Sequence, residues 1–153
     1  PHNNPVMEYL QVRGRLKSAD LITKRNIRAM IRALKDGKSV WYTSDQDFGR
    51  SNAVFVPFFA VPQAATVVGA SILTNASDSV VLPYIVVRKA DGSGYHIELK
   101  APLEGFPCGD DTKDAIFSNK VVEQSIMAAP DQYMWLHRRF KTRPDPSDPS
   151  LYS

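Results

Sequence analysis

The segment YTSDQDFGRS, residues 42–51, places two carboxylates, a glycine and an arginine directly after an apolar run. Asp45 and Asp47 could supply oxygen ligands to a divalent ion, although hard cations normally take more oxygens than two carboxylates provide. The same side chains could instead orient an arginine or accept hydrogen bonds from sugar hydroxyls. A polar turn with Gly49 at a positive φ is the third interpretation.

A second group of residues with chemical potential is RGRLKS, residues 13–18, in which three bases surround Gly14. The planar fork of donors on an arginine suits a phosphate or a developing oxyanion. The alternative is a turn between two helices whose bases face solvent.

The bases of the chain are unevenly distributed, although its formal net charge is only +3. Residues 13–38 hold nine bases and two acids, and residues 138–143 hold four bases and no acid. Such basic faces indicate an anionic partner, which could be nucleic acid, anionic lipid, a phosphorylated substrate or an acidic protein. A solvated helix face is the alternative.

Several classes of protein are disfavoured by composition and motif content. The 153 residues suffice for one domain with a core, and 43% hydrophobic content indicates a globular chain. The lone Cys108 cannot form an internal disulfide, and no apolar run approaches the roughly 18 residues that span a bilayer. P-loop, G-x-S-x-G, G-x-G-x-x-G and zinc-ligand patterns are absent from the sequence.

Periodicity predicts that strands alternate with helices, which gives an α/β or a mixed α+β fold, with a mixed sheet and packed helices. Gly14 should end the first helix, and Gly37 should close the second. The strand at 79–88 should be buried on both faces, because its apolar run is continuous. We expect helices at 5–12, 20–36, 63–75 and 110–128, strands at 39–43, 53–59 (an edge strand or a packed loop), 79–88 and 95–100, a short segment at 131–140, and a poorly ordered tail at 144–153.

Long motifs throughout the chain resemble one enzyme family. They are NNPVMEYLQVRGRLKS at 3–18, WYTSDQDFGRSNAVFVPFFAVPQAATVVGAS at 41–71, RKADGSGYHIEL at 88–99, DQYMWLHRRFKTRP at 131–144 and RPDPSDPSLY at 143–152. Together they resemble the lipid A late acyltransferases, of the lauroyl and myristoyl type, within the glycerol-phosphate-acyltransferase-like superfamily. The resemblance implies transfer of an acyl chain from acyl carrier protein to a hydroxyl of a lipid A precursor.

The resemblance also implies partners and a location. The enzyme should work at the cytoplasmic face of the bacterial inner membrane, with any anchor outside this chain and no cofactor. The basic helix expected at 20–36 would face the acidic acyl carrier protein, the glucosamine phosphates or an anionic membrane surface. Nucleic acid is not expected as a partner. The aromatic and basic stretch at 131–144 could be a core helix or an interfacial element. The rival classes are a non-catalytic module that binds anionic lipid or nucleic acid, and a metal-dependent hydrolase built on Asp45 and Asp47.

Catalytic roles are implied for few residues of this chain. The family's signature is a His-x4-Asp/Glu pair, but no histidine here has an acid five residues later. By this resemblance, we expect residues 1–143 to be the C-terminal part of a single acyltransferase domain, incomplete at its N-terminal side and inactive alone. By resemblance, Arg15 is the catalytic arginine, which stabilises the thioester oxyanion or holds an acceptor phosphate. Asp45 and Asp47 would shape the acceptor site or pair with Arg15, and Arg50 would meet a phosphate.

Overall fold

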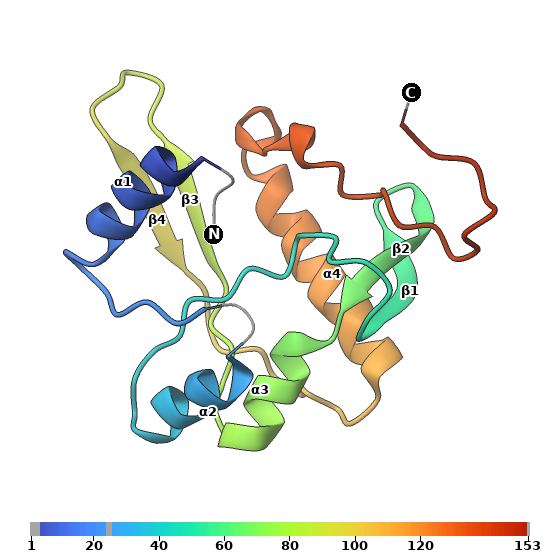
Figure 1. Cartoon of the computed structure of the whole chain (residues 1–153), viewed down its shortest axis with the longest axis horizontal. Coiled ribbons are helices and arrows are strands. Elements are labelled where there is room, and N and C mark those ends of the chain that lie inside the picture. Colours follow the sequence, from blue (N-terminus) through green and yellow to red (C-terminus); the bar gives the residue numbers. More distant parts are fainter. Residues whose placement is uncertain (1–3, 24–25, 153) are drawn as a thin grey trace. The chain divides into compact units, whose positions relative to one another are not determined.

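The computed structural model describes residues 4–23 and 26–152 (Figure 1). The chain divides into two compact units, of which the first ends at Val40 and the second begins at Trp41. Each unit is described by itself. The α/β content is confirmed, but the strands form two separate two-stranded antiparallel sheets and not one mixed sheet.

The first unit begins with helix α1, Pro5–Arg15. Asn4 caps the helix, because its side chain accepts hydrogen bonds from the backbone N–H groups of Val6 (2.9 Å) and Met7 (3.2 Å). The expectation that Gly14 ends this helix was wrong, since α1 continues to Arg15. A single helical glycine costs only about 1 kcal/mol relative to alanine, so the helix tolerates it.

Helix α2, Ile27–Lys35, completes the first unit. The expected start at residue 20 was wrong, because residues 20–23 are irregular, and residues 24 and 25 lie outside the described residues. Asn26 caps the helix by accepting from the backbone N–H of Ala29 at 3.1 Å. Gly37 ends it at φ +76°, as predicted. Met30 is the buried residue of its inner face.

The second unit contains a hairpin of strands β1, Ala53–Phe58, and β2, Val61–Val67. A bulge interrupts the register beside Pro57, which lacks the N–H needed for regular pairing. The edge strand expected at 53–59 is confirmed. The helix expected at 63–75 was wrong over residues 63–67, which belong to β2 and of which 64–67 pair with β1, and helix α3 covers only Gly69–Ser77. Pairing with a neighbouring strand outweighs the weak helical preference of this alanine-containing run.

A second hairpin joins β3, Tyr84–Arg88, and β4, Tyr95–Leu99, which lie within the strands expected at 79–88 and 95–100. The expected burial of β3 on both faces was wrong, because exposed and half-buried residues alternate along it and every residue of β4 is exposed. The strand expected at 39–43 was also wrong, since those residues are irregular.

Helix α4, Asp111–Met127, packs against β1 and forms the core of the second unit (Figure 1). Asp110 caps it through the backbone N–H groups of Thr112 and Lys113, both at 3.0 Å. Residues 131–140 hold two single 3₁₀ turns, η1 (Pro130–Gln132) and η2 (Trp135–His137), in place of a helix. Two clusters of buried residues make the core, and they comprise Val56, Val68 and Ala115, and Phe58, Ala64 and Ile126.

Candidate functional site

Residues 45–50, here named the aspartate loop, are held by residues 133–144, here named the C-terminal segment. Hydrogen bonds between residues 92, 94 and 95 positions apart in sequence join the two stretches at three places. Tyr42 leads into the loop, and its ring lies over Gly69 so closely that a Cβ there would collide with the phenol oxygen. The glycine at the start of α3 thus allows the chain before the loop to pack. Burial raises the pKa of Tyr42.

Asp47 anchors the aspartate loop through three hydrogen bonds and is only 5% exposed. Its Oδ1 accepts hydrogen bonds from the Gly49 backbone N–H (2.9 Å) and the Thr142 hydroxyl (2.8 Å). Its Oδ2 accepts from the Thr142 backbone N–H at 2.8 Å. Gly49 has φ +88°, so the predicted turn is present within this arrangement. Hydrogen bonds to an ionised carboxylate are stronger than neutral ones, so Asp47 fixes the loop to the C-terminal segment.

Asp45 lies nearer to solvent than Asp47 and is half-buried. Its backbone carbonyl is 3.2 Å from Nε2 of His137, whose Nδ1 is 2.5 Å from the Met134 carbonyl. The Tyr133 hydroxyl lies 3.4 Å from the same Nε2. Burial, followed by the nearby Asp45 carboxylate, raises the pKa of Tyr133 well above its ordinary value. Asp45 therefore presents a carboxylate beside a phenol that stays protonated.

Arg139 lies behind this pair and is only 3% exposed. Its guanidinium donates to the Ala65 carbonyl (2.7 Å) and the Thr66 hydroxyl (3.1 Å), and it lies 4.7 Å from the centre of the Phe58 ring. Burial lowers the pKa of Arg139, while Tyr133 and the carboxylates of the loop oppose that shift. Its positive charge thus offsets the two carboxylates from inside the protein.

The polar network continues from Arg139 into α4. The Asn119 side-chain amide donates to the Thr66 hydroxyl (3.0 Å) and to the Pro57 carbonyl (2.7 Å). Both Thr66 and Asn119 are buried. Through these bonds, the C-terminal segment, β2 and α4 share one hydrogen-bonded framework, which supports the aspartate loop.

Arg50 ends the aspartate loop and is exposed. It donates through Nη1 to the Pro144 carbonyl at 2.6 Å and through Nη2 to the Arg143 carbonyl. Its guanidinium also lies 5.7 Å from the centre of the Phe55 ring. Two of its donors thus bind the beginning of the tail, whose Tyr152 hydroxyl in turn accepts from the Phe140 N–H at 2.9 Å.

The residues implied by the resemblance fall in both units. Arg15 is the last residue of α1 in the first unit and is exposed, whereas the aspartate loop belongs to the second unit. Within the second unit the structure brings the loop together with four residues that sequence reasoning missed, namely Tyr133, His137, Arg139 and Thr142. Residues 131–144 had been singled out only for their aromatic and basic composition, and no spacing rule connects them with a loop so distant in sequence.

Two absences in the described part of the chain bear on the alternatives. Within residues 4–23 and 26–152, no group of three or more His, Cys, Asp or Glu side chains is placed to hold a metal ion. In the same residues, no helix has the length and apolar character needed to cross a membrane.

The arrangement at Asp45, a half-buried acceptor beside a protonated phenol and an imidazole, can bind a hydroxyl or amine group.

Comparisons with known proteins find similar sequences over nearly the whole chain. Residues 1–142 match the family model described as bacterial lipid A biosynthesis acyltransferase. A lipid A biosynthesis acyltransferase of Haemophilus influenzae is 47% identical over 99% of this chain and 50% of the relative. The palmitoleoyltransferase and the lauroyltransferase of lipid A biosynthesis in Escherichia coli are each 46% identical over 99% of the chain, and 49% and 50% of their own lengths are covered.

The chain thus spans about half the length of the curated relatives it matches. The matches include the aspartate loop and nearly the whole C-terminal segment, which the hydrogen bonds of the second unit join. Since the family model covers almost every residue, the chain belongs to the bacterial lipid A biosynthesis acyltransferase family.

Proposed function

We propose that the protein containing this chain transfers a fatty acyl chain from the thioester of acyl carrier protein to a hydroxyl of a lipid A precursor. The observation that carries the proposal is the 46–47% identity, over 99% of the chain, with relatives named as lipid A acyltransferases. In this reaction the acceptor oxygen attacks the thioester carbonyl, the carbon–sulfur bond breaks, and the hydroxyl proton passes to the thiolate that leaves.

The proposal gives the four sequence-predicted residues different tasks. Arg15 stabilises the oxyanion or holds an acceptor phosphate, because a guanidinium offers paired donors to either group. Asp45 contacts the acceptor sugar, since its carboxylate is half-buried and not enclosed. Asp47 shapes the acceptor site by fixing the loop through Thr142 and Gly49. Arg50 meets a phosphate with the face that it does not use to bind the tail.

The same proposal covers the partners and the location. The exposed bases Arg28, Arg32 and Lys35 on α2 suit the acidic acyl carrier protein or the glucosamine phosphates. The reaction would take place at the cytoplasmic face of the bacterial inner membrane, where an acyl carrier protein and a lipid acceptor can meet. The general base would be a histidine outside residues 1–153, because no histidine of this chain has an acid five residues later.

A chimeric enzyme tests the proposal directly. This chain would replace the matching half of the E. coli lauroyltransferase, and acyl transfer from acyl carrier protein to a lipid A precursor would be measured. We expect activity from the chimera and none from residues 1–153 alone. A folded chimera without activity would count against the proposed function, and turnover by the isolated chain would refute an external base.

Two substitutions in the chimera separate the proposed roles. Arg15→Ala should lower kcat by roughly 100-fold, as loss of an oxyanion donor commonly does. The matched control is Lys38→Ala, which removes an exposed base of the same unit that pairs with Asp20 and should leave kcat unchanged. Asp45→Asn should raise KM for the lipid acceptor without changing KM for the acyl carrier protein thioester. Equal kcat for the Arg15 and Lys38 variants would remove Arg15 from the site.

A further inference from the structure

Helix α1 carries a continuous apolar stripe although none of its residues is buried. At 100° per residue, five apolar side chains lie on one side of the helix. Four of them have more than half of their surface exposed, at 64%, 60%, 55% and 59%. The stripe comprises Val6, Tyr9, Leu10, Val12 and Leu16, with Val12 half-buried and the other four exposed.

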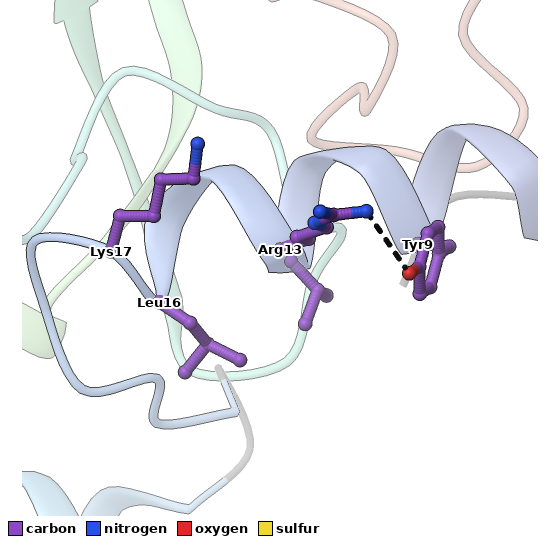
Figure 2. Close-up of a pocket in the computed structure, with 5 residues that line it drawn as sticks. Tyr9, Arg13, Leu16 and Lys17 are labelled. Carbon is purple, nitrogen blue, oxygen red and sulfur yellow. Dashed lines mark hydrogen bonds between the residues drawn. The ribbon is translucent and has the colours of Figure 1, made fainter.

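Two bases adjoin these apolar residues, Arg13 within the helix and Lys17 two residues after its end. Arg13 and Lys17 lie between the apolar residues, and together with Tyr9, Val12 and Leu16 they line a shallow hollow (Figure 2). Arg13 donates to the Tyr9 hydroxyl at 3.5 Å, which places the guanidinium beside the phenol. Arg15 is about 200° from Arg13 around the helix and therefore faces another direction. The stripe is thus separate from the residue proposed for catalysis.

The mixture of bases and apolar groups decides which partner fits. A dry protein interface would bury two cations, which is costly unless acids pair with them. A membrane surface satisfies both kinds of side chain, because acyl chains cover the apolar residues while lipid phosphates meet the bases. The first unit carries nine bases and three acids, a net charge of +6, which complements an anionic surface.

We propose that the apolar and basic side of α1 binds the surface of a membrane that contains anionic phospholipid. The helix lies parallel to the surface, with Tyr9 and Leu16 in the acyl boundary and Arg13 and Lys17 at the phosphates. This inference rests on the proposed function only in placing the protein at a membrane, and it does not require acyl transfer.

Sedimentation of the 153-residue chain with vesicles tests the inference. We expect binding to vesicles of phosphatidylcholine with 30% phosphatidylglycerol, and much weaker binding to phosphatidylcholine alone or at 0.5 M salt. Arg13→Gln and Lys17→Gln together should weaken binding by about 30-fold, since each base near an anionic surface contributes about fivefold. Equal binding to the two kinds of vesicle would overturn the proposal.

A matched pair of variants locates the contact. Tyr9→Ser with Leu16→Ser removes an aromatic and an aliphatic residue that are 60% and 59% exposed. Tyr95→Ser with Ile97→Ser removes the same kinds of residue from β4, where they are 64% and 67% exposed. We expect at least tenfold weaker vesicle binding for the α1 pair and no change for the β4 pair. Loss of binding in the β4 pair alone would place the contact on the hairpin and refute the proposal.

A second copy of this chain is the other occupant to be tested. Sedimentation velocity without lipid should give the same oligomeric state for the wild type and for the variant with Tyr9→Ser and Leu16→Ser. Dissociation caused by the α1 pair would show that the stripe joins two copies, which would overturn the membrane contact. Vesicle binding without acyl transfer in the chimera would refute the proposed function and leave this inference standing.

Discussion

The two units of this chain differ in how many residues they bury and in the sign of their net charge. Among the described residues of the first unit, Met30 alone is buried, whereas the second unit encloses two hydrophobic clusters and seven buried polar residues. The first unit has a net charge of +6 and the second a net charge of −3. The difference indicates that the second unit supplies the stable framework and the first supplies a basic surface on a small core.

The buried polar residues of the second unit are compatible with its stability because they form hydrogen bonds. Buried polar groups are tolerated when they are hydrogen-bonded, and Thr66, Asn119 and Arg139 bond to one another or to backbone carbonyls. This network meets the aspartate loop, so stability of the framework and geometry of the candidate site should change together. The predictions below test that difference between the units.

The largest effect should come from Phe58→Ala in the second unit. Phe58 is fully buried and packs against Ala64 and Ile126, so its truncation should cost about 3–5 kcal/mol of unfolding free energy. Urea unfolding followed by tryptophan fluorescence measures this, because Trp41 and Trp135 both lie in the second unit. The neighbouring Phe59→Ala, at a 37% exposed position, is the control and should cost clearly less. Equal losses would show that this cluster is not the core.

Asp47→Ala should have the next largest effect, about 3 kcal/mol on unfolding in the same experiment. It removes three hydrogen bonds to a buried carboxylate and leaves the Thr142 backbone N–H without that partner. The control is Asp91→Ala, which removes an exposed carboxylate from the hairpin turn. A loss for Asp47→Ala no greater than for the control would mean that the loop is not fastened through Thr142.

Local signals predicted local structure well. The strand expected at 95–100 and the helix expected at 110–128 are present as β4 and α4, and Gly37 ends α2 as predicted. The failures depended on partners elsewhere in the chain. Residues 64–67 form a strand because β1 pairs with them, and exposed residues alternate with half-buried ones along the apolar run before Arg88, because one side of that strand is left open to solvent.

The candidate site shows the same limit. The acidic loop could be recognised from Asp45 and Asp47, since two carboxylates beside a glycine and an arginine are chemically conspicuous. The residues that hold this loop could not be recognised in the same way, because the hydrogen bond from Thr142 to Asp47 joins residues 95 positions apart. Arg139 is one base within a basic run, and only the fold shows that it is buried against Phe58. Residue type identified the candidate site residues, whereas tertiary packing determined which residues hold them in position.

Alkaline pH should reveal the environment of Tyr133. Its pKa is raised in the folded state, so the folded protein keeps a proton that the unfolded chain releases above about pH 10. Stability should therefore fall as pH rises beyond the unfolded value, and Tyr133→Phe should make that fall shallower. Urea unfolding at pH 9, 10 and 10.5 measures the slope. Tyr95→Phe, at an exposed position, is the control and should not change it.

The smallest global effect should come from Asn4→Ala in the first unit. The substitution removes the cap of α1, a change that typically costs about 1 kcal/mol in helix stability. Because no residue of α1 is buried, this loss should stay local. Native hydrogen exchange should show faster exchange of the α1 amides and unchanged exchange in α4, while urea unfolding of the second unit keeps its midpoint. A lower midpoint would mean that the two units unfold as one, and the contrast between a stable framework and a lightly supported basic surface would have to be abandoned.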